Sequence, residues 1–129
     1  MSSETDLEAV MRDFKRGFAK ADRESFARAI TDDFEWHMHW FDSGDEQPTG
    51  KVLVGLDAVM EEIARRQAGW SDLHYEDVEE RYLDDMVVQT FVVSGIDDKG
   101  LRFHCAAVDL YPVRDGRIAR KQTYWKQPG

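Results

Sequence analysis

The 129-residue chain has a single cysteine and no long hydrophobic run, and both shortages exclude kinds of protein. Cys105 has no second cysteine with which to form an internal disulfide. No apolar stretch approaches the roughly 20 residues that a membrane-spanning helix needs. The first residues also lack an apolar signal segment and a basic leader. We therefore expect a cytoplasmic protein.

Basic residues are scarce relative to acidic ones. Lysine and arginine number 17 against 26 aspartates and glutamates, which gives a formal net charge of −9. This charge repels phosphate backbones and anionic lipid surfaces. We expect neither nucleic acid nor membrane as a partner.

The chain length suits one domain. A chain of this size buries roughly two thirds of its unfolded surface, which is enough for a core and one cavity. The longest linker-like segment, DSGDEQPTGK at residues 42–51, is too short to separate two modules. We expect a single domain over residues 1–129.

Three helices are predicted from apolar spacing. The first follows a possible capping box of Thr5 and Glu8, and a second, shorter helix is capped by Asp22 and ends before TDD at 31–33. A third begins near Gly55. Their apolar stripes are Leu7, Val10, Met11, Phe14 and Phe18, then Phe26, Ala27, Ala29 and Ile30, then Leu56, Val59, Met60 and Ile63.

Strand signals dominate the rest of the chain. FEWHMHW at 34–40 and KVLVG at 51–55 read as strands, and four more follow from Leu73, separated by DD, DDKG and RDG. The prediction is an α+β fold in which three early, N-terminal helices pack on one face of a curved, mainly antiparallel sheet. A cone remains between helices and sheet, where a ligand would sit.

Three stretches resemble a known family. They are AKADRESFARAITDDFEW at 19–36, GLDAVMEEIA at 55–64 and VDLYPVRDGRIARKQTYW at 108–125. Together they are similar to the nuclear transport factor 2-like superfamily, in its SnoaL-like and ketosteroid-isomerase-like branch. The resemblance implies a cone-shaped, cystatin-like roll with a pocket, usually in a dimer. It fixes no reaction, because this fold hosts isomerases, dehydratases, cyclases, epoxide hydrolases and binding-only proteins.

The resemblance carries over unevenly to the catalytic positions. The steroid isomerase oxyanion acid falls on Asp109 and its pocket tryptophan on Trp125, whereas its tyrosine falls on Phe14 and its general base on Met38. The steroid isomerase mechanism therefore lacks its base and its hydroxyl. The SnoaL-type cyclases also place an acid/base aspartate in the strand of Asp109. The last-strand aspartate of the epoxide hydrolases falls on Thr123, so that triad is incomplete too.

Alternation in FEWHMHW separates two faces. Because Met38 matches a base that reaches the ligand, Trp36 and Met38 point to the pocket side, where they are either pocket walls or plain core. His37 and His39 point away. They are better explained as polar groups on a solvated or subunit-contacting face than as metal ligands, since no motif supplies a third ligand. We expect no metal site.

Asp109 is the sharpest chemical signal because it interrupts an apolar strand, FHCAAVDLY at 103–111. An unpaired buried charge costs several kcal/mol, so a partner is required. With RDG as a three-residue loop, Val113 pairs with Arg117 and Asp109 lies opposite Lys121. The same counting places Ala107 opposite Thr123 and Cys105 opposite Trp125. In the preceding hairpin, taking DDKG as the loop places Val88, Thr90 and Val92 on the same sheet face as Asp109.

Lys121 leaves two interpretations of Asp109 open. In the first interpretation the two residues form a structural ion pair. In the second they face a ligand, and Asp109 transfers a proton to or from it.

Three charged residues lie two apart on another predicted strand, namely Asp77, Glu79 and Arg81. Their side chains either point into the pocket or form a solvated rim, and the solvated rim is favoured.

Three functions compete. The first is a cofactor-free isomerase, lyase or hydrolase acting on a small, mostly apolar molecule, with Asp109 and Lys121 as catalytic residues. The second is a non-catalytic binder of a hydrophobic metabolite, and the third is an assembly module with a vestigial cavity. The expected pocket walls are Phe14, Phe18, Trp36, Met38, Val88, Thr90, Thr123 and Trp125.

A homodimer is also expected, because helices cover only one sheet face. The other face should carry Phe91, Val93, Ala106, Val108, Leu110 and Tyr124, which are too apolar for water.

Overall fold

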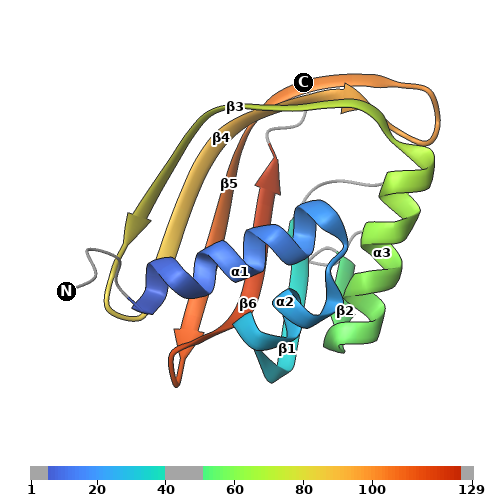
Figure 1. Cartoon of the computed structure of the whole chain (residues 1–129). Coiled ribbons are helices and arrows are strands. Elements are labelled where there is room, and N and C mark those ends of the chain that lie inside the picture. Colours follow the sequence, from blue (N-terminus) through green and yellow to red (C-terminus); the bar gives the residue numbers. More distant parts are fainter. Residues whose placement is uncertain (1–5, 40–50, 126–129) are drawn as a thin grey trace.

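The computed structural model describes residues 6–39 and 51–125, the side chain of His39 excepted. Three helices lie against one face of a curved six-stranded sheet, and the long strands arch over α1 and α2 (Figure 1). The elements are α1 (Asp6–Lys20), α2 (Arg23–Ala29), β1 (Ile30–His39), β2 (Lys51–Val54), α3 (Gly55–Gly69), β3 (Ser71–Tyr82), β4 (Met86–Ile96), β5 (Arg102–Arg114) and β6 (Arg117–Trp125).

The α+β class, the curved sheet and a third helix that begins at Gly55 are confirmed, but the description of all three helices as N-terminal is not. Helix α3 lies mid-chain, because β1 and β2 both precede it. The sheet order is β2-β1-β6-β5-β4-β3, and every neighbouring pair is antiparallel except β1 and β6. The sheet is therefore mainly antiparallel.

Helices α1 and α2 pack closely. Gly17 on α1 allows this approach, because a Cβ there would lie 2.6 Å from the Cβ of Phe26. The predicted cap of α2 is confirmed, since an Asp22 carboxylate oxygen accepts a hydrogen bond from the Ser25 backbone N–H at 3.3 Å. The capping box at Thr5 lies outside the described residues.

The register between β4 and β5 differs from the prediction by one residue. Ile96 pairs with Arg102, so the hairpin loop has five residues and includes Leu101. The Asp97 side chain holds this loop by accepting hydrogen bonds from the backbone N–H groups of Lys99 and Leu101. A shift of one residue exchanges the faces of a strand. Val88, Thr90 and Val92 consequently lie on the face away from Asp109, whereas Phe91 and Val93 lie on its face.

The register between β5 and β6 differs by two residues. Asp115 and Gly116 form a two-residue turn, both with positive φ, and Arg114 pairs with Arg117. An irregularity between Leu110 and Val113 then shifts the pairing. As a result, Asp109 lies opposite Thr123 and Ala107 opposite Trp125, not opposite Lys121 and Thr123. Because a shift of two preserves the face, Asp109, Lys121 and Trp125 still share the inner face.

Strand β3 carries a bulge near Asp77, which has φ 54°. Beyond it, Glu79 pairs with Thr90 and Arg81 with Val88, so both belong to the outer face and are exposed. The solvated-rim interpretation of these charges is confirmed. Glu80 is the acid that reaches inward, because it pairs with the inner-face residue Gln89.

The core lies between the helices and the inner sheet face. Its largest fully buried side chains are Trp36, Phe14, Phe26, Phe34, Met11 and Met38. A second, smaller cluster on the same face consists of Phe91, Val93 and Ala107, with Phe103, Cys105 and Trp125 packed against it.

Candidate functional site

A buried polar cluster interrupts the inner face where β5 meets β6. Asp109 and Lys121 are 2% and 6% exposed, and Lys121 Nζ donates to Asp109 Oδ2 at 2.9 Å. The Tyr111 hydroxyl donates to the same oxygen at 3.0 Å and accepts from Lys121 Nζ at 3.1 Å. Two donors therefore hold one carboxylate oxygen. The predicted burial of Asp109 and its contact with Lys121 are confirmed.

The other carboxylate oxygen, Asp109 Oδ1, is buried and has no hydrogen-bond partner among the described residues. Buried polar atoms in proteins are almost always paired, so an unpaired one is a place where a further molecule can be bound. A carboxylate with one fixed and one unpaired oxygen can accept a hydrogen bond or a proton at the unpaired oxygen.

Lys121 lies among aromatic rings. Its Nζ is 4.6 Å from the ring centroid of Phe18 and 5.8 Å from that of Phe14. Burial lowers the pKa of Lys121, while the charge and hydrogen bond of Asp109 oppose that shift. Burial also raises the pKa of Tyr111 well above its ordinary value, and the neighbouring Asp109 charge raises it further. Tyr111 is consequently a neutral hydrogen-bond donor at neutral pH.

Four of the predicted pocket residues are at most 3% exposed, namely Phe14, Trp36, Met38 and Thr123. Phe14, Trp36 and Met38 belong to the main core cluster, and the Trp36 indole N–H donates to Thr123 Oγ1 at 3.0 Å. Phe18 is half-buried and packs edge-on against Trp36 with ring centroids 5.3 Å apart. Trp36 and Met38 thus face the inner side, as predicted, and both are core.

Beside the Asp109 cluster, α3 supplies a charged pair that sequence reasoning missed. Arg66 is 9% exposed, and its Nε donates to a Glu62 carboxylate oxygen at 2.9 Å. Its guanidinium carbon lies 4.7 Å from the ring centroid of Trp36 and 4.5 Å from that of Trp70. In the sequence, only the helical spacing of Glu62 and Arg66 with the apolar residues Val59 and Ile63 indicates that they share the buried face of α3.

A second hydrogen-bonded group leads from the cluster toward α1. Gln89 Nε2 donates to a Glu80 carboxylate oxygen at 2.8 Å, and Gln89 Oε1 lies 3.4 Å from the Tyr111 hydroxyl oxygen, whose single proton points to Asp109. Glu80 also accepts from Lys15 at 3.0 Å and from Tyr82 at 2.8 Å. Burial alone would raise the pKa of Glu80, but these hydrogen bonds outweigh it and lower the pKa. The carboxylate is therefore charged at neutral pH.

His37 lies on the other face of β1, as predicted. Its Nε2 is 2.9 Å from a Glu35 carboxylate oxygen. Within residues 6–39 and 51–125, no three histidine, cysteine, aspartate or glutamate side chains gather as a set that could hold a metal ion.

No described helix is long and apolar enough to cross a membrane.

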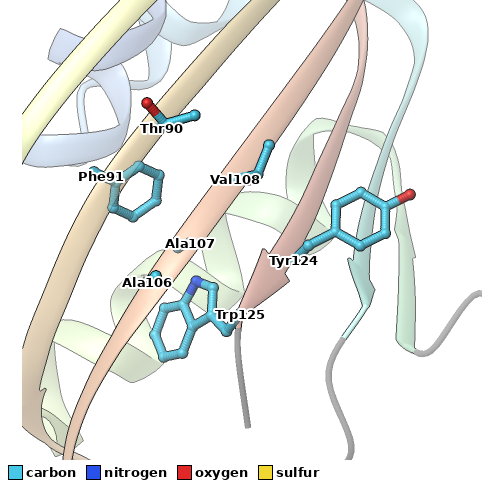
Figure 2. A pocket seen from close by; sticks show the side chains of 7 residues that line it. All are labelled: Thr90, Phe91, Ala106, Ala107, Val108, Tyr124 and Trp125. Atoms are coloured by element: carbon cyan, nitrogen blue, oxygen red, sulfur yellow. The ribbon is translucent and has the colours of Figure 1, made fainter.

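An open hollow of about 440 Å³ lies over β4, β5 and β6 (Figure 2). The outer-face residues Thr90, Ala106, Val108 and Tyr124 line it, and the inner-face residues Phe91, Ala107 and Trp125 border it as well. The register of β4 with β5 places Thr90 on the outer face, opposite Val108. Val88 is likewise an outer-face residue. The complete lining is Thr90, Phe91, Ala106, Ala107, Val108, Tyr124 and Trp125.

Sequence comparison identifies the family. Residues 11–121 match the SnoaL-like domain family, which is most of the chain. This chain belongs to the SnoaL-like domain family. No curated protein matches it.

Solved structures share the fold at low identity. An NTF2-like protein from Burkholderia xenovorans is 16% identical with a TM-score of 0.76, covering 94% of this chain and 89% of that one. A Catenulispora acidiphila protein with a ketosteroid isomerase-like fold, solved in complex with trimethylamine, is 15% identical (TM-score 0.68, 91% and 85% covered). TerC, co-crystallised with polyporic acid, is 19% identical (TM-score 0.70, 94% and 91% covered). Such identities establish the NTF2-like fold of this SnoaL-like protein and nothing about its ligand.

Proposed function

We propose that this SnoaL-like protein binds a small, mostly apolar molecule on the inner sheet face and that Asp109 exchanges a proton with it. The observation that carries the proposal is the unpaired Oδ1 of a carboxylate whose Oδ2 is fixed by Lys121 and Tyr111. One structural neighbour was solved in complex with trimethylamine and another was co-crystallised with polyporic acid, which supports a fold that accepts organic molecules.

The chemistry needs no cofactor. Asp109 Oδ1 removes a proton from an acidic C–H or O–H group of the ligand and later returns it to the same or another atom. Lys121 and Tyr111 hold the carboxylate in one orientation through their hydrogen bonds to Oδ2. Such proton transfer is the common step of cofactor-free isomerases, lyases and hydrolases, and within this family a cyclase-like reaction uses it too.

A non-catalytic binder is the second candidate, and Phe14 and Met38 favour it. Both occupy catalytic positions of the steroid isomerases, and both are buried apolar side chains. In addition, Lys121 already balances the Asp109 charge. In this case the same inner face holds a hydrophobic metabolite, and Asp109 contributes only a hydrogen bond.

The proposal includes a homodimer formed through the outer sheet face. Outer-face residues Val92, Val108 and Leu110 are only half-buried, and Tyr124 is exposed beside the hollow. Phe91 and Val93 no longer belong to this argument, because both lie on the inner face. A second subunit would remove this apolar surface from water.

Proton exchange into a ketone tests the catalytic candidate. The probe is 2-tetralone in neutral deuterium oxide, and mass spectrometry follows replacement of the C–H hydrogens beside its carbonyl by deuterium. Asp109 should take the proton, exchange it with solvent and return a deuteron, so Asp109→Asn should slow exchange by about 100-fold or more. The control is Asp57→Asn, which alters an exposed carboxylate on α3.

Binding and exchange of 2-tetralone together distinguish the catalytic candidate from the non-catalytic binder. If 2-tetralone perturbs the NMR spectrum of the protein without faster exchange than buffer, the protein is a binder. If the probe neither binds nor exchanges, the inner face is not a site for small apolar ketones, and the proposal fails for that class.

A further inference from the structure

Trp70 Nε1 is the second buried side-chain atom without a hydrogen-bond partner among the described residues, beside Asp109 Oδ1. The two atoms are complementary, because the indole N–H is only a donor and the carboxylate oxygen is an acceptor. A molecule that pairs both atoms needs a hydrogen-bond acceptor for the Trp70 indole N–H and a hydrogen-bond donor for Asp109 Oδ1.

Trp70 and Asp109 border the same part of the inner face. The Trp70 ring centroid lies 5.9 Å from that of Trp125, and Trp125 pairs with Ala107, two residues before Asp109 on β5. The Trp70 ring also lies 5.3 Å from Phe103. The two unpaired atoms are thus separated by an aromatic surface, on which an apolar ring could lie.

The Arg66 guanidinium lies at the Trp70 end of the site, with its carbon 4.5 Å from the Trp70 ring centroid. Among the described residues, the Glu62 carboxylate forms ion pairs with Arg65, Arg66 and Lys51. A guanidinium beside a buried N–H favours a carbonyl or carboxylate oxygen, although the chain as a whole is acidic.

Tyr75 extends the aromatic surface toward β4. Its ring packs edge-on against that of the inner-face residue Phe91 with centroids 5.6 Å apart, and the residue is 49% exposed.

We propose that the ligand of this site is a flat, mostly apolar molecule with an acceptor oxygen at one end and a hydroxyl at the other. The Trp70 indole N–H donates to the carbonyl or carboxylate oxygen beside Arg66, and Asp109 Oδ1 accepts from the hydroxyl. Trp125 and Phe103 contact the ring between them. This inference rests on the proposed function and adds the ligand class and two specificity-determining residues, Trp70 and Arg66.

Three naphthalene probes separate the two contacts. They are 2-naphthol, 2-naphthoate and 6-hydroxy-2-naphthoate, and their dissociation constants are measured by calorimetry on the full chain. The last compound carries both groups and should bind about tenfold more tightly than either of the others, as expected for one added hydrogen bond. Its binding should also shift the NMR signal of the Trp70 indole proton, identified by its absence in Trp70→Phe.

Matched variants assign the carboxylate end. Trp70→Phe keeps an aromatic ring and should weaken both carboxylate probes about fivefold to tenfold, with 2-naphthol unchanged. Arg66→Met should do the same, whereas Arg65→Met, which removes a half-exposed neighbour bound to the same Glu62, should change binding less than about twofold. Thermal melting establishes that each variant is folded.

Two results overturn the inference in different ways. If Trp70→Phe binds the carboxylate probes as tightly as the natural chain, Trp70 is not the donor, while retained binding of 2-naphthol leaves the proposed function standing. If no probe binds below about 1 mM, both the ligand class and the proposed function are wrong for flat aromatic molecules.

Discussion

Lys121 and Asp109 form their ion pair diagonally across two strands, not from directly opposed positions. Asp109 lies opposite Thr123, yet Lys121 Nζ reaches its Oδ2 at 2.9 Å. A lysine two residues out of register spans the offset because its stem is long and flexible. The ammonium group then lies under the aromatic rings of α1, where Phe18 is nearest. One strand residue thereby links the sheet, the first helix and the candidate site.

Replacing Asp109 by asparagine should destabilise the protein. Asp109→Asn keeps the shape but leaves Lys121 as an uncompensated buried charge, which should lower the free energy of unfolding by about 1 to 3 kcal/mol. Urea denaturation measures this change. The double variant Asp109→Asn with Lys121→Met should recover most of the loss. A double variant as unstable as the single one would show that the two side chains are not an energetic unit.

Glu62 should contribute to stability in a pH-dependent manner. Burial alone raises its pKa, but hydrogen bonds from Arg65 and the charge of Arg66 outweigh burial, so the net pKa is lowered. A carboxyl with a lowered pKa in the folded state stabilises the fold above its ordinary pKa of 4.5, and that stability is lost as pH falls through the folded pKa.

Glu62→Gln therefore should unfold more readily at neutral pH, by about 1 to 3 kcal/mol, and should lose less stability than the natural chain on acidification below pH 4.5. Denaturation series across this pH range provide the measurement. Glu61→Gln, at the exposed neighbouring position, is the matched control and should retain the full acid dependence. An identical acid profile for Glu62→Gln would contradict the assignment.

Steroid isomerisation should be absent. The family mechanism needs a base at Met38 and a hydroxyl at Phe14, and loss of a general base alone typically removes a factor of about 100 to 10,000. The absorbance of the conjugated ketone formed from a β,γ-unsaturated ketosteroid reports the reaction. Turnover at an enzyme-like rate would mean that another group supplies the base and that the position-by-position comparison is wrong.

The outer sheet face should bring two chains together. Light scattering at micromolar concentration should give twice the 15.0 kDa monomer mass. Val108→Glu changes a residue that lines the hollow and should shift the mass to that of the monomer, whereas Leu83→Glu, at an exposed position that does not line the hollow, should not. A monomeric natural chain would contradict the dimer.

The register errors explain how much of the site could be predicted. Counting residues from RDG as a three-residue loop predicts Asp109 and Lys121 on one face, and the offset of two residues in the structure leaves that result intact. At the hairpin between β4 and β5, a loop one residue longer than predicted reverses which β4 side chains face the core. Leu101 looks like a strand residue, but hydrogen bonds to Asp97 hold it in the loop, and Val88, Thr90 and Phe91 therefore exchange sides.

Arg66 and Trp70 escaped sequence reasoning for a different reason. Helical periodicity predicts apolar residues on the buried face, and an arginine there looks like a solvated residue. Its burial depends on Glu62 one turn before it and on Trp36 from a distant strand. Partners brought together only by the tertiary structure cannot be inferred from local spacing.

The pairing of β1 with β6 determines when this protein can fold. Trp36 is synthesised long before Thr123, the residue that accepts its indole hydrogen bond, and Ile30 pairs with Ile118. On the ribosome, the edge of β1 that pairs with β6 has no partner strand until β6 has been synthesised. Folding of the sheet is therefore a late event dominated by non-local contacts, which slows it, and a chain shortened before β6 should aggregate instead of folding.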